Sequence, residues 1–212
     1  MSTDGAARKL IFLPGAGGDP DFWRPVGDLL PSEWNKIYLG WPNVGHQKAD
    51  PAIRGFGDLV TLVEPFLNDE PVDLLAQSMG GIVALRVALN RPERVRRLVL
   101  AATSGGVNVA GLGGVDWRPA YRREFPKAAA WITDVQPNLS HELGSITQPS
   151  LLLWGDADAI SPIAVGKRLQ QLLPHATLRI VAAGDHGLIR EGAVEVAPLI
   201  STHLTSGSDQ RT

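Results

Sequence analysis

Six short, largely apolar segments recur along the chain, and they limit the folds open to it. They span residues 9–13, 36–40, 72–77, 95–103, 150–155 and 177–183. Continuous apolar runs, as opposed to an alternation of apolar and polar residues, are typical of strands that are covered on both faces. The sequence therefore predicts an α/β fold: a doubly wound, mostly parallel sheet of six strands with helices on either side.

Helical patterns fill the intervals between these segments, which is what parallel strands require of their connections. The predicted helices span 22–30, 54–67, 79–90, 164–173 and 188–204, and several of them end at Pro or Asn. With 212 residues, 44% of them hydrophobic, the chain can build one large core. We therefore expect a single domain over residues 1–212, with a disordered polar tail over 205–212.

One interval, residues 104–149, is too long for a single crossover helix. Its first part, 104–114, is rich in glycine, which favours a flexible linker. Farther on, Trp117, Tyr121 and Phe125 recur every four residues and would share one face of a helix. We interpret the interval as a short helical lid inserted after the fourth strand. The alternative is a surface excursion that these aromatic residues anchor to the core.

Charge and composition exclude several classes of function. Twenty basic and 22 acidic residues give a net charge of -2, so nothing indicates nucleic acid or an anionic membrane as a partner. The absence of cysteine excludes disulfides, a thiol nucleophile and thiolate metal ligands. No signal-peptide pattern opens the chain, and no apolar run approaches the roughly 18 residues of a membrane span. We expect a cytoplasmic protein, and the sequence favours no particular oligomeric state.

Ser78 stands at a corner where a predicted strand passes directly into a predicted helix. A residue at such a corner is strained and exposed, and its neighbours must be small so that the helix can pack against the strand. Ala76 lies two positions before it, and Gly80 and Gly81 follow. The segment "AQSMGG" resembles the G-x-S-x-G nucleophile elbow of the α/β-hydrolase family, with Ala76 in place of the first glycine. A serine that only caps the helix is the alternative.

The resemblance implies an acid and a histidine later in the chain, because a serine hydroxyl needs a base, and the base needs a carboxylate to orient it. The family's pattern G-x-x-D followed closely by proline fits Gly155, Asp158 and Pro162 after the fifth predicted strand. It therefore places the acid at Asp158, and Asp156 is interpreted as a turn residue bonded to its own backbone. His186 follows the sixth strand, where the family's base lies.

Four other histidines compete with His186 for the role of base: His46, His141, His175 and His203. Only His186 lies in the loop between the last predicted strand and the final helix. His46 follows the second strand and is either a pocket residue or a loop histidine. We interpret His175 and His203 as solvated surface residues.

The resemblance also implies two backbone N–H groups that bind the oxyanion formed when serine attacks a carbonyl. Met79, the residue after the nucleophile, supplies one of them at the N-terminus of a helix. The segment "LPGAGG" resembles the family's H-G-x-x-G loop, with Pro14 where histidine is usual, and this alignment assigns the second N–H to Ala16. A nucleotide-phosphate loop is disfavoured because Pro20 occupies the last glycine position of G-x-G-x-x-G.

The resemblance also implies a trimmed architecture. The family's sheet usually begins with an antiparallel pair of strands, but only eight residues precede Lys9. We therefore expect a six-stranded sheet of the α/β-hydrolase type that lacks this N-terminal pair.

The implied activity is that of a serine esterase. Ser78 attacks the carbonyl of a small-molecule ester or thioester, His186 transfers the proton, and Asp158 stabilises the imidazolium, with no metal or organic cofactor. The pocket is expected to be apolar and to take a small to medium acyl group. Its expected walls are Phe22, Trp23, Trp41, Trp117 and Tyr121. Two alternatives remain: a lyase or C–C bond hydrolase that uses the same triad, and a non-catalytic ligand-binding member of the fold.

Overall fold

All six predicted strands form, and they lie in one sheet. The computed structural model describes residues 8–68, 70–134 and 137–206, so the predicted tail beyond residue 206 lies outside the described residues. The strands are β1 (Lys9–Leu13), β2 (Asn35–Tyr38), β3 (Val72–Gln77), β4 (Val95–Ala101), β5 (Ser150–Gly155) and β6 (Ala176–Val181). Their order is β2-β1-β3-β4-β5-β6, and every pairing is parallel. Six parallel strands with helices between them confirm the predicted fold class.

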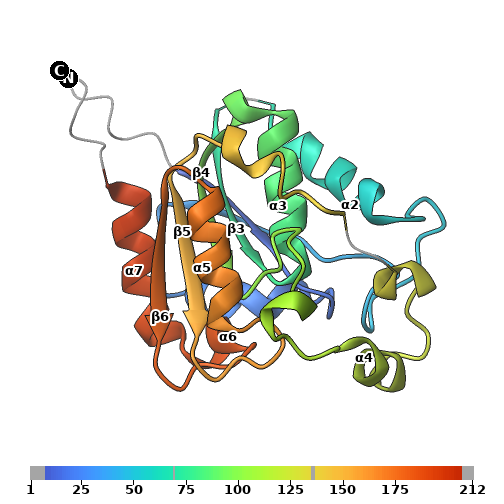
Figure 1. Ribbon diagram of the computed structural model, residues 1–212. Coiled ribbons are helices and arrows are strands. Elements are labelled where there is room, and N and C mark those ends of the chain that lie inside the picture. The colour runs from blue at the N-terminus through green and yellow to red at the C-terminus, as the bar shows by residue number, and fades with distance from the viewer. Residues whose placement is uncertain (1–7, 69, 135–136, 207–212) are drawn as a thin grey trace.

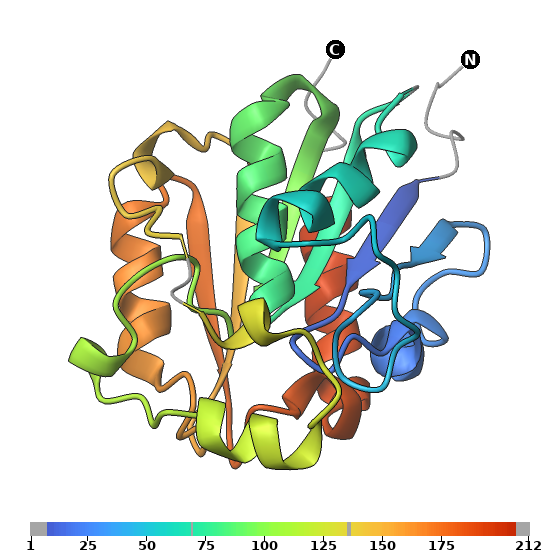
Figure 2. The ribbon, with the colours of Figure 1, turned by 90° about the vertical axis from the view of Figure 1, so that its right-hand side faces the viewer.

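Helices cover both faces of this sheet (Figure 1). One face carries α2 (Phe56–Val63), α3 (Met79–Asn90) and α5 (Ile163–Leu172), and the other carries α1 (Arg24–Gly27), α6 (Leu188–Glu191) and α7 (Ala193–Thr205). A further helix, α4 (Arg118–Glu124), lies past the carboxyl ends of the strands (Figure 2). Short 3-10 helices are η1 (Pro20–Trp23), η2 (Glu64–Phe66), η3 (Pro92–Arg94), η4 (Ala110–Leu112), η5 (Ala130–Thr133) and η6 (Leu143–Ser145).

Strand β1 shows why the apolar runs are continuous. Ile11 and Leu13 belong to the core between the sheet and helices α2, α3 and α5, whereas Leu10 and Phe12 belong to the core beneath α1, α6 and α7. All four side chains are buried. A strand that packs on both faces buries successive side chains on opposite sides, so its apolar residues run on without alternating with polar ones.

Two predicted helices differ from the observed ones. The predicted helix over 188–204 is interrupted at Gly192, which ends α6 and begins α7. The predicted helix over 22–30 becomes η1 followed by α1, which ends at Gly27. Pro25 has no N–H to donate to the Asp21 carbonyl four positions earlier, so η1 does not continue into one longer helix. Glycine is a poor helix residue, and α1 ends at Gly27.

The inserted segment, residues 104–149, contains η4, α4, η5 and η6. Trp117, Tyr121 and Phe125 lie in series along α4 and its two ends. The Trp117 and Tyr121 ring centroids are 5.4 Å apart, and those of Tyr121 and Phe125 are 4.8 Å apart. The shared aromatic face that the four-residue spacing predicts is therefore present.

The edge of the sheet at the amino ends of the strands holds a buried ion-pair cluster. The Asp73 carboxylate in β3 is fully buried, and it accepts hydrogen bonds from Arg96 at 2.9 and 2.7 Å and from Arg8 at 3.1 Å. Pairing of this kind is what allows a carboxylate to be buried. The cluster lies at the opposite edge from the site described below, which leaves the carboxyl edge free for function.

In the part of the chain that the structure describes, no helix is both long enough and apolar enough to cross a membrane.

Candidate active site

Ser78 occupies a sharp corner between β3 and α3. Its backbone has φ 51° and ψ -119°, a positive φ that non-glycine residues rarely adopt. The corner is fixed on both sides, because the Ser78 N–H donates to the Ala101 carbonyl at 2.9 Å and the Gly81 N–H donates to the Ser78 carbonyl at 3.0 Å. A strained residue held this firmly is characteristic of a functional position.

Small neighbours make this corner possible. A Cβ atom on Gly80 would lie 2.6 Å from the Leu13 carbonyl oxygen and still closer to that of Pro14. A Cβ atom on Gly81 would overlap the side chain of Thr103. Helix α3 can therefore begin directly against β1 and β4 only because both positions are glycine.

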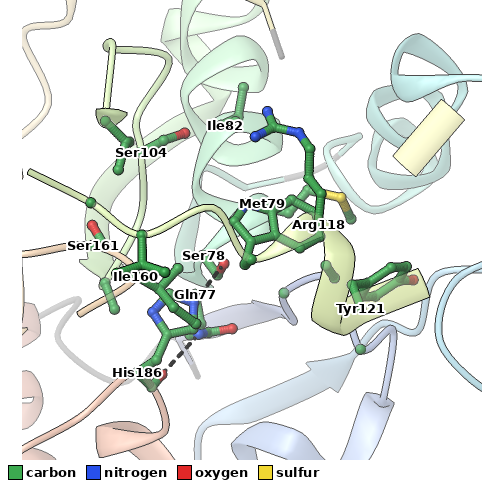
Figure 3. A pocket seen from close by; sticks show the side chains of 18 of the residues that line it. Gln77, Ser78, Met79, Ile82, Ser104, Arg118, Tyr121, Ile160, Ser161 and His186 are labelled. Carbon is green, nitrogen blue, oxygen red and sulfur yellow. Dashed lines mark hydrogen bonds between the residues drawn. The ribbon is translucent and has the colours of Figure 1, made fainter. Parts of the chain in front are cut away.

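The structure brings Ser78, His186 and Asp158 together, although they are far apart in the sequence. His186 Nε2 lies 3.0 Å from Ser78 Oγ (Figure 3), and His186 Nδ1 lies 2.8 Å from Asp158 Oδ2. The imidazole therefore bridges a serine hydroxyl and a carboxylate. This geometry allows a proton to pass from the hydroxyl to the ring while the carboxylate stabilises the resulting charge.

The Asp158 carboxylate is buried and held in place by backbone donors. Its Oδ1 atom accepts hydrogen bonds from the N–H groups of Ile160 at 2.8 Å and Ser161 at 2.9 Å, which leaves Oδ2 for His186. The two donors therefore fix the orientation of the carboxylate. Asp156 is exposed, as a turn residue would be, but its partner differs from the expected one: it accepts from the Ala183 N–H at 2.7 Å and not from its own backbone.

Gln77 is a site residue that our sequence analysis did not identify. It is buried, it precedes Ser78, and its side-chain amide donates to the backbone carbonyl of His186 at 3.1 Å. Figure 3 shows Gln77 beside His186 at the floor of the cavity. The only signal in the sequence is a polar residue at the end of a buried strand.

The two predicted oxyanion donors belong to Ala16 and Met79, and both residues line the same cavity as Ser78. Met79 is the first residue of α3, where N–H groups have no partner within the helix. Ala16 lies in a turn that the Gly18 N–H closes on the Gly15 carbonyl at 3.0 Å. The side chain of Gln77 packs against Gly15, where a Cβ atom would collide with it. The turn therefore lies against the residue that precedes the nucleophile.

A cavity of about 930 Å³ opens above Ser78. Of the five expected wall residues, Phe22, Trp117 and Tyr121 line it. Polar side chains also reach it, from Asn108 and Arg118 among others. The cavity can hold a medium-sized organic molecule, and its lining combines apolar and aromatic surface with polar and charged groups.

The expectation for Trp23 and Trp41 was wrong. Both side chains are fully buried and neither lines the cavity. Their indole N–H groups donate to the backbone carbonyls of Leu13 and Pro14, at 3.1 and 2.7 Å respectively. An aromatic residue next to a glycine-rich loop gives the same sequence signal whether it faces a ligand or packs beneath the loop.

The inserted segment is fixed to the loop between β2 and α2. The Gly45 N–H donates to the Tyr121 hydroxyl at 2.9 Å, and the Ala129 N–H donates to the Asn43 carbonyl at 2.8 Å. His46 does not line the cavity: it is exposed and packs against the Phe125 ring, with centroids 4.8 Å apart. Burial raises the pKa of the Tyr121 phenol, so this residue stays neutral at physiological pH.

Among the described residues, no group of three or more His, Asp or Glu side chains could hold a metal ion.

Comparisons with known proteins agree with the observed fold. Residues 9–137 match the family model described as alpha/beta hydrolase fold, and residues 116–212 match one described as TAP-like protein. The carboxylesterase CesB (YbfK) from Bacillus subtilis has a similar structure, with a TM-score of 0.74 and 22% identity over 95% of this chain and 85% of that one.

Two curated proteins show the range of chemistry among relatives. A pimeloyl-[acyl-carrier protein] methyl ester esterase of Photobacterium profundum is 27% identical over 87% of this chain and 89% of its own length. A 2-succinyl-6-hydroxy-2,4-cyclohexadiene-1-carboxylate synthase of Klebsiella pneumoniae subsp. pneumoniae is 32% identical over 54% of this chain and 48% of its own length. Since the alpha/beta-hydrolase model matches more than half of the sequence, from β1 through the corner at Ser78, the chain belongs to the α/β-hydrolase fold family.

Proposed function

We propose that the protein is a carboxylic-ester hydrolase that forms an acyl-enzyme on Ser78. The observation that carries the proposal is the continuous hydrogen-bonded path from Ser78 Oγ through the His186 ring to Asp158, at 3.0 and 2.8 Å. It lies at the carboxyl edge of a parallel sheet and opens into a cavity. The esterase named among the relatives supports the same class of reaction.

In the proposed reaction, Ser78 Oγ attacks the carbonyl carbon of the ester while His186 Nε2 takes the hydroxyl proton. The tetrahedral intermediate collapses, and His186 returns this proton to the departing alkoxide or thiolate. A water molecule then attacks the acyl-enzyme with His186 again as base, which releases the carboxylic acid and restores the Ser78 hydroxyl. Asp158 stays ionised throughout and stabilises the imidazolium.

The Ala16 and Met79 N–H groups are the proposed oxyanion donors. The charge that develops on the carbonyl oxygen would lie between the turn after β1 and the N-terminus of α3, where the helix dipole also favours negative charge. Because these donors are backbone groups held by the fold, they need little reorganisation during the reaction.

The substrate that we propose is an ester or thioester with a small to medium, mainly apolar acyl group. The cavity volume of about 930 Å³ is too large for a two-carbon acyl group alone and suits a medium-sized molecule. Phe22, Trp117 and Tyr121 offer aromatic contact surface. We further propose that residues 104–149 act as a lid within one domain, since Trp117 and Tyr121 of this segment line the cavity.

A carbon–carbon lyase is the second candidate, because one relative is named as a synthase of a cyclohexadiene carboxylate. That relative matches only about half of this chain, whereas the esterase matches most of it. A panel of simple esters separates the two candidates, since a lyase would turn over few of them.

A fluorophosphonate tests the machinery directly. The purified protein should gain one adduct by intact mass, and peptide mapping should place that adduct on Ser78. Ser78→Ala and His186→Ala should abolish labelling, whereas Ser104→Ala, which removes another serine that lines the cavity, should leave it intact. Hydrolysis of a short acyl ester should fall about a million-fold in Ser78→Ala. An adduct that survives in Ser78→Ala would contradict the proposal.

A further inference from the structure

Two buried indole N–H groups donate to consecutive carbonyls at the end of β1. The Trp23 indole donates to the Leu13 carbonyl at 3.1 Å, and the Trp41 indole donates to the Pro14 carbonyl at 2.7 Å. Both tryptophans have no exposed surface. The Leu13 and Pro14 carbonyls belong to residues three and two positions before Ala16, the proposed second oxyanion donor.

The two tryptophans approach this segment from opposite faces of the sheet. Trp23 belongs to the core beneath α1, α6 and α7, and Trp41 belongs to the core beneath α2, α3 and α5. On the same face as Trp41, Gly80 of α3 packs so closely on the Leu13 and Pro14 carbonyls that it has no room for a side chain. The chain between β1 and the turn is thereby held from both faces of the sheet.

Trp41 holds the oxyanion turn at both ends. Its side chain binds the Pro14 carbonyl, and its backbone N–H donates to the Gly18 carbonyl at 3.1 Å. Between these two points, the Gly18 N–H closes the turn on the Gly15 carbonyl at 3.0 Å. The described part of the chain contains no cis peptide bond, so the N–H of Ala16 must point away from the carbonyl of Gly15. Fixing the turn therefore fixes the direction of the Ala16 N–H.

We propose that Trp41 is a positioning residue that aims the Ala16 N–H at the oxyanion, with Trp23 as a weaker support on the other face. This inference rests on the proposed hydrolase function. Pro14 stands where the related loop carries a histidine, so the loop lacks that side chain as a brace. The indole N–H of Trp41 holds Pro14 instead, by donating to the Pro14 carbonyl.

The expected effect is on the transition state and not on substrate binding. Removing a whole oxyanion donor lowers kcat by about 100- to 1,000-fold. Loss of the Trp41 N–H leaves the Ala16 donor present but less well aimed, so kcat should fall by roughly tenfold, a fraction of that loss. KM should change by less than about twofold, because only interactions that are specific to the transition state are lost.

The test replaces Trp41 by Phe and, as a second variant, by β-(3-benzothienyl)alanine, which keeps the ring volume and puts sulfur in place of the N–H. Both variants are measured for kcat and KM on a short acyl ester and for Ki of a trifluoromethyl ketone, whose hemiketal oxyanion occupies the same donors. We expect kcat to fall and Ki to rise by a similar factor in both variants. The benzothienyl variant keeps the proposal testable if Trp41→Phe does not fold.

Ile200→Val supplies the matched control, since it removes one buried methylene from α7 on the opposite face of the sheet. It should lower the melting temperature without changing kcat or Ki. A folded benzothienyl variant whose kcat and Ki equal those of the wild type would overturn the proposal.

Hydrogen exchange gives a readout that does not depend on activity. The amide of Gly18 should exchange faster in the benzothienyl variant than in Ile200→Val. A wild-type protein that neither hydrolyses esters nor reacts with a fluorophosphonate would overturn the proposed function alone. In that case, exchange at Gly18 that is unchanged in the benzothienyl variant would still overturn the proposal that Trp41 holds the turn, and faster exchange would support it.

Discussion

The side-chain amide of Gln77 donates a hydrogen bond to the backbone carbonyl of His186, with 3.1 Å between the two heavy atoms. Gln77 is the last residue of β3 and is joined directly to Ser78. The residue beside the proposed nucleophile thus binds the loop that carries the proposed base. The separation between Ser78 and His186 therefore depends on the Gln77 amide as well as on β3 and β6, the strands that precede the two residues.

We expect Gln77→Leu to lower kcat by roughly three- to tenfold, which corresponds to the loss of one hydrogen bond worth about 1 kcal/mol. The leucine fills a similar volume but cannot hold the His186 carbonyl. Steady-state kinetics on a short acyl ester measures the effect. Gln148→Leu is the control, because the Gln148 amide also donates to a backbone carbonyl, that of Pro92 at 2.8 Å, away from the cavity. Equal losses of kcat in the two variants would exclude a specific role for Gln77.

Asp158→Asn should lower kcat by roughly ten-thousand-fold, because an amide at this position favours the wrong tautomer of the histidine and cannot stabilise its charge. The same substitution at Asp156 is the matched control. Asparagine retains an oxygen for the Ala183 N–H, so Asp156→Asn should stay within about threefold of the wild type, the effect of losing less than one ordinary hydrogen bond. If Asp156→Asn proves the more damaging of the two, the acid has been assigned to the wrong residue.

The sequence was sufficient to place the strands and the corner at Ser78, because both depend on local patterns. Continuous apolar runs predict buried parallel strands, and the small residues around Ser78 are needed wherever a strand turns directly into a helix. The spacing of Asp158 and His186 along later strands then brings both residues to the edge of the sheet where Ser78 lies, as the structure shows.

The roles of Trp23, Trp41 and Gln77 could not be predicted, because each depends on which neighbour a side chain meets across the sheet. From the sequence, a tryptophan near the oxyanion loop is predicted to be a pocket wall. Only the structure shows that its indole N–H donates to a backbone carbonyl beneath the loop. His203 shows the same limit: it lies in the last turn of α7, and its position predicts a solvated side chain, yet it is half-buried and hydrogen-bonded to the Leu98 carbonyl. Distance along the chain does not reveal these contacts.

Gly80→Ala should destabilise the fold by about 1–3 kcal/mol, the usual cost of forcing an extra methyl group into a packed site. The new Cβ atom would press on the Leu13 carbonyl at 2.6 Å and on that of Pro14, and neither backbone group can move without disturbing β1. Gly57→Ala is the control, since a Cβ atom there meets nothing within 4 Å in helix α2. It should raise stability by about 0.5 kcal/mol. Urea unfolding curves compare the two, and a Gly80→Ala protein as stable as Gly57→Ala would show that the contact is not tight.

The stability of the fold should depend on pH through His203. Burial and the nearby Arg97 guanidinium together lower the pKa of this imidazole from its ordinary value of 6.5 to about 4, against smaller opposing effects of the Leu98 carbonyl and of Asp73. As pH falls below about 6.5, His203 becomes protonated in the unfolded chain, whereas in the folded protein it becomes protonated only near pH 4. The folded state is therefore destabilised progressively across this window, and the effect is complete below it.

We expect His203→Gln to lose this dependence, because glutamine can still donate to the Leu98 carbonyl but does not titrate. Between pH 7 and pH 4 the unfolding free energy of the wild type should fall by about 2 kcal/mol more than that of the variant, a figure reduced for the part of the ring that water reaches. Urea unfolding at a series of pH values measures the difference. His175→Gln is the control, since that side chain is exposed, and it should follow the wild type. Parallel curves for the wild type and His203→Gln would mean that His203 accepts its proton in the folded state as readily as in the unfolded chain.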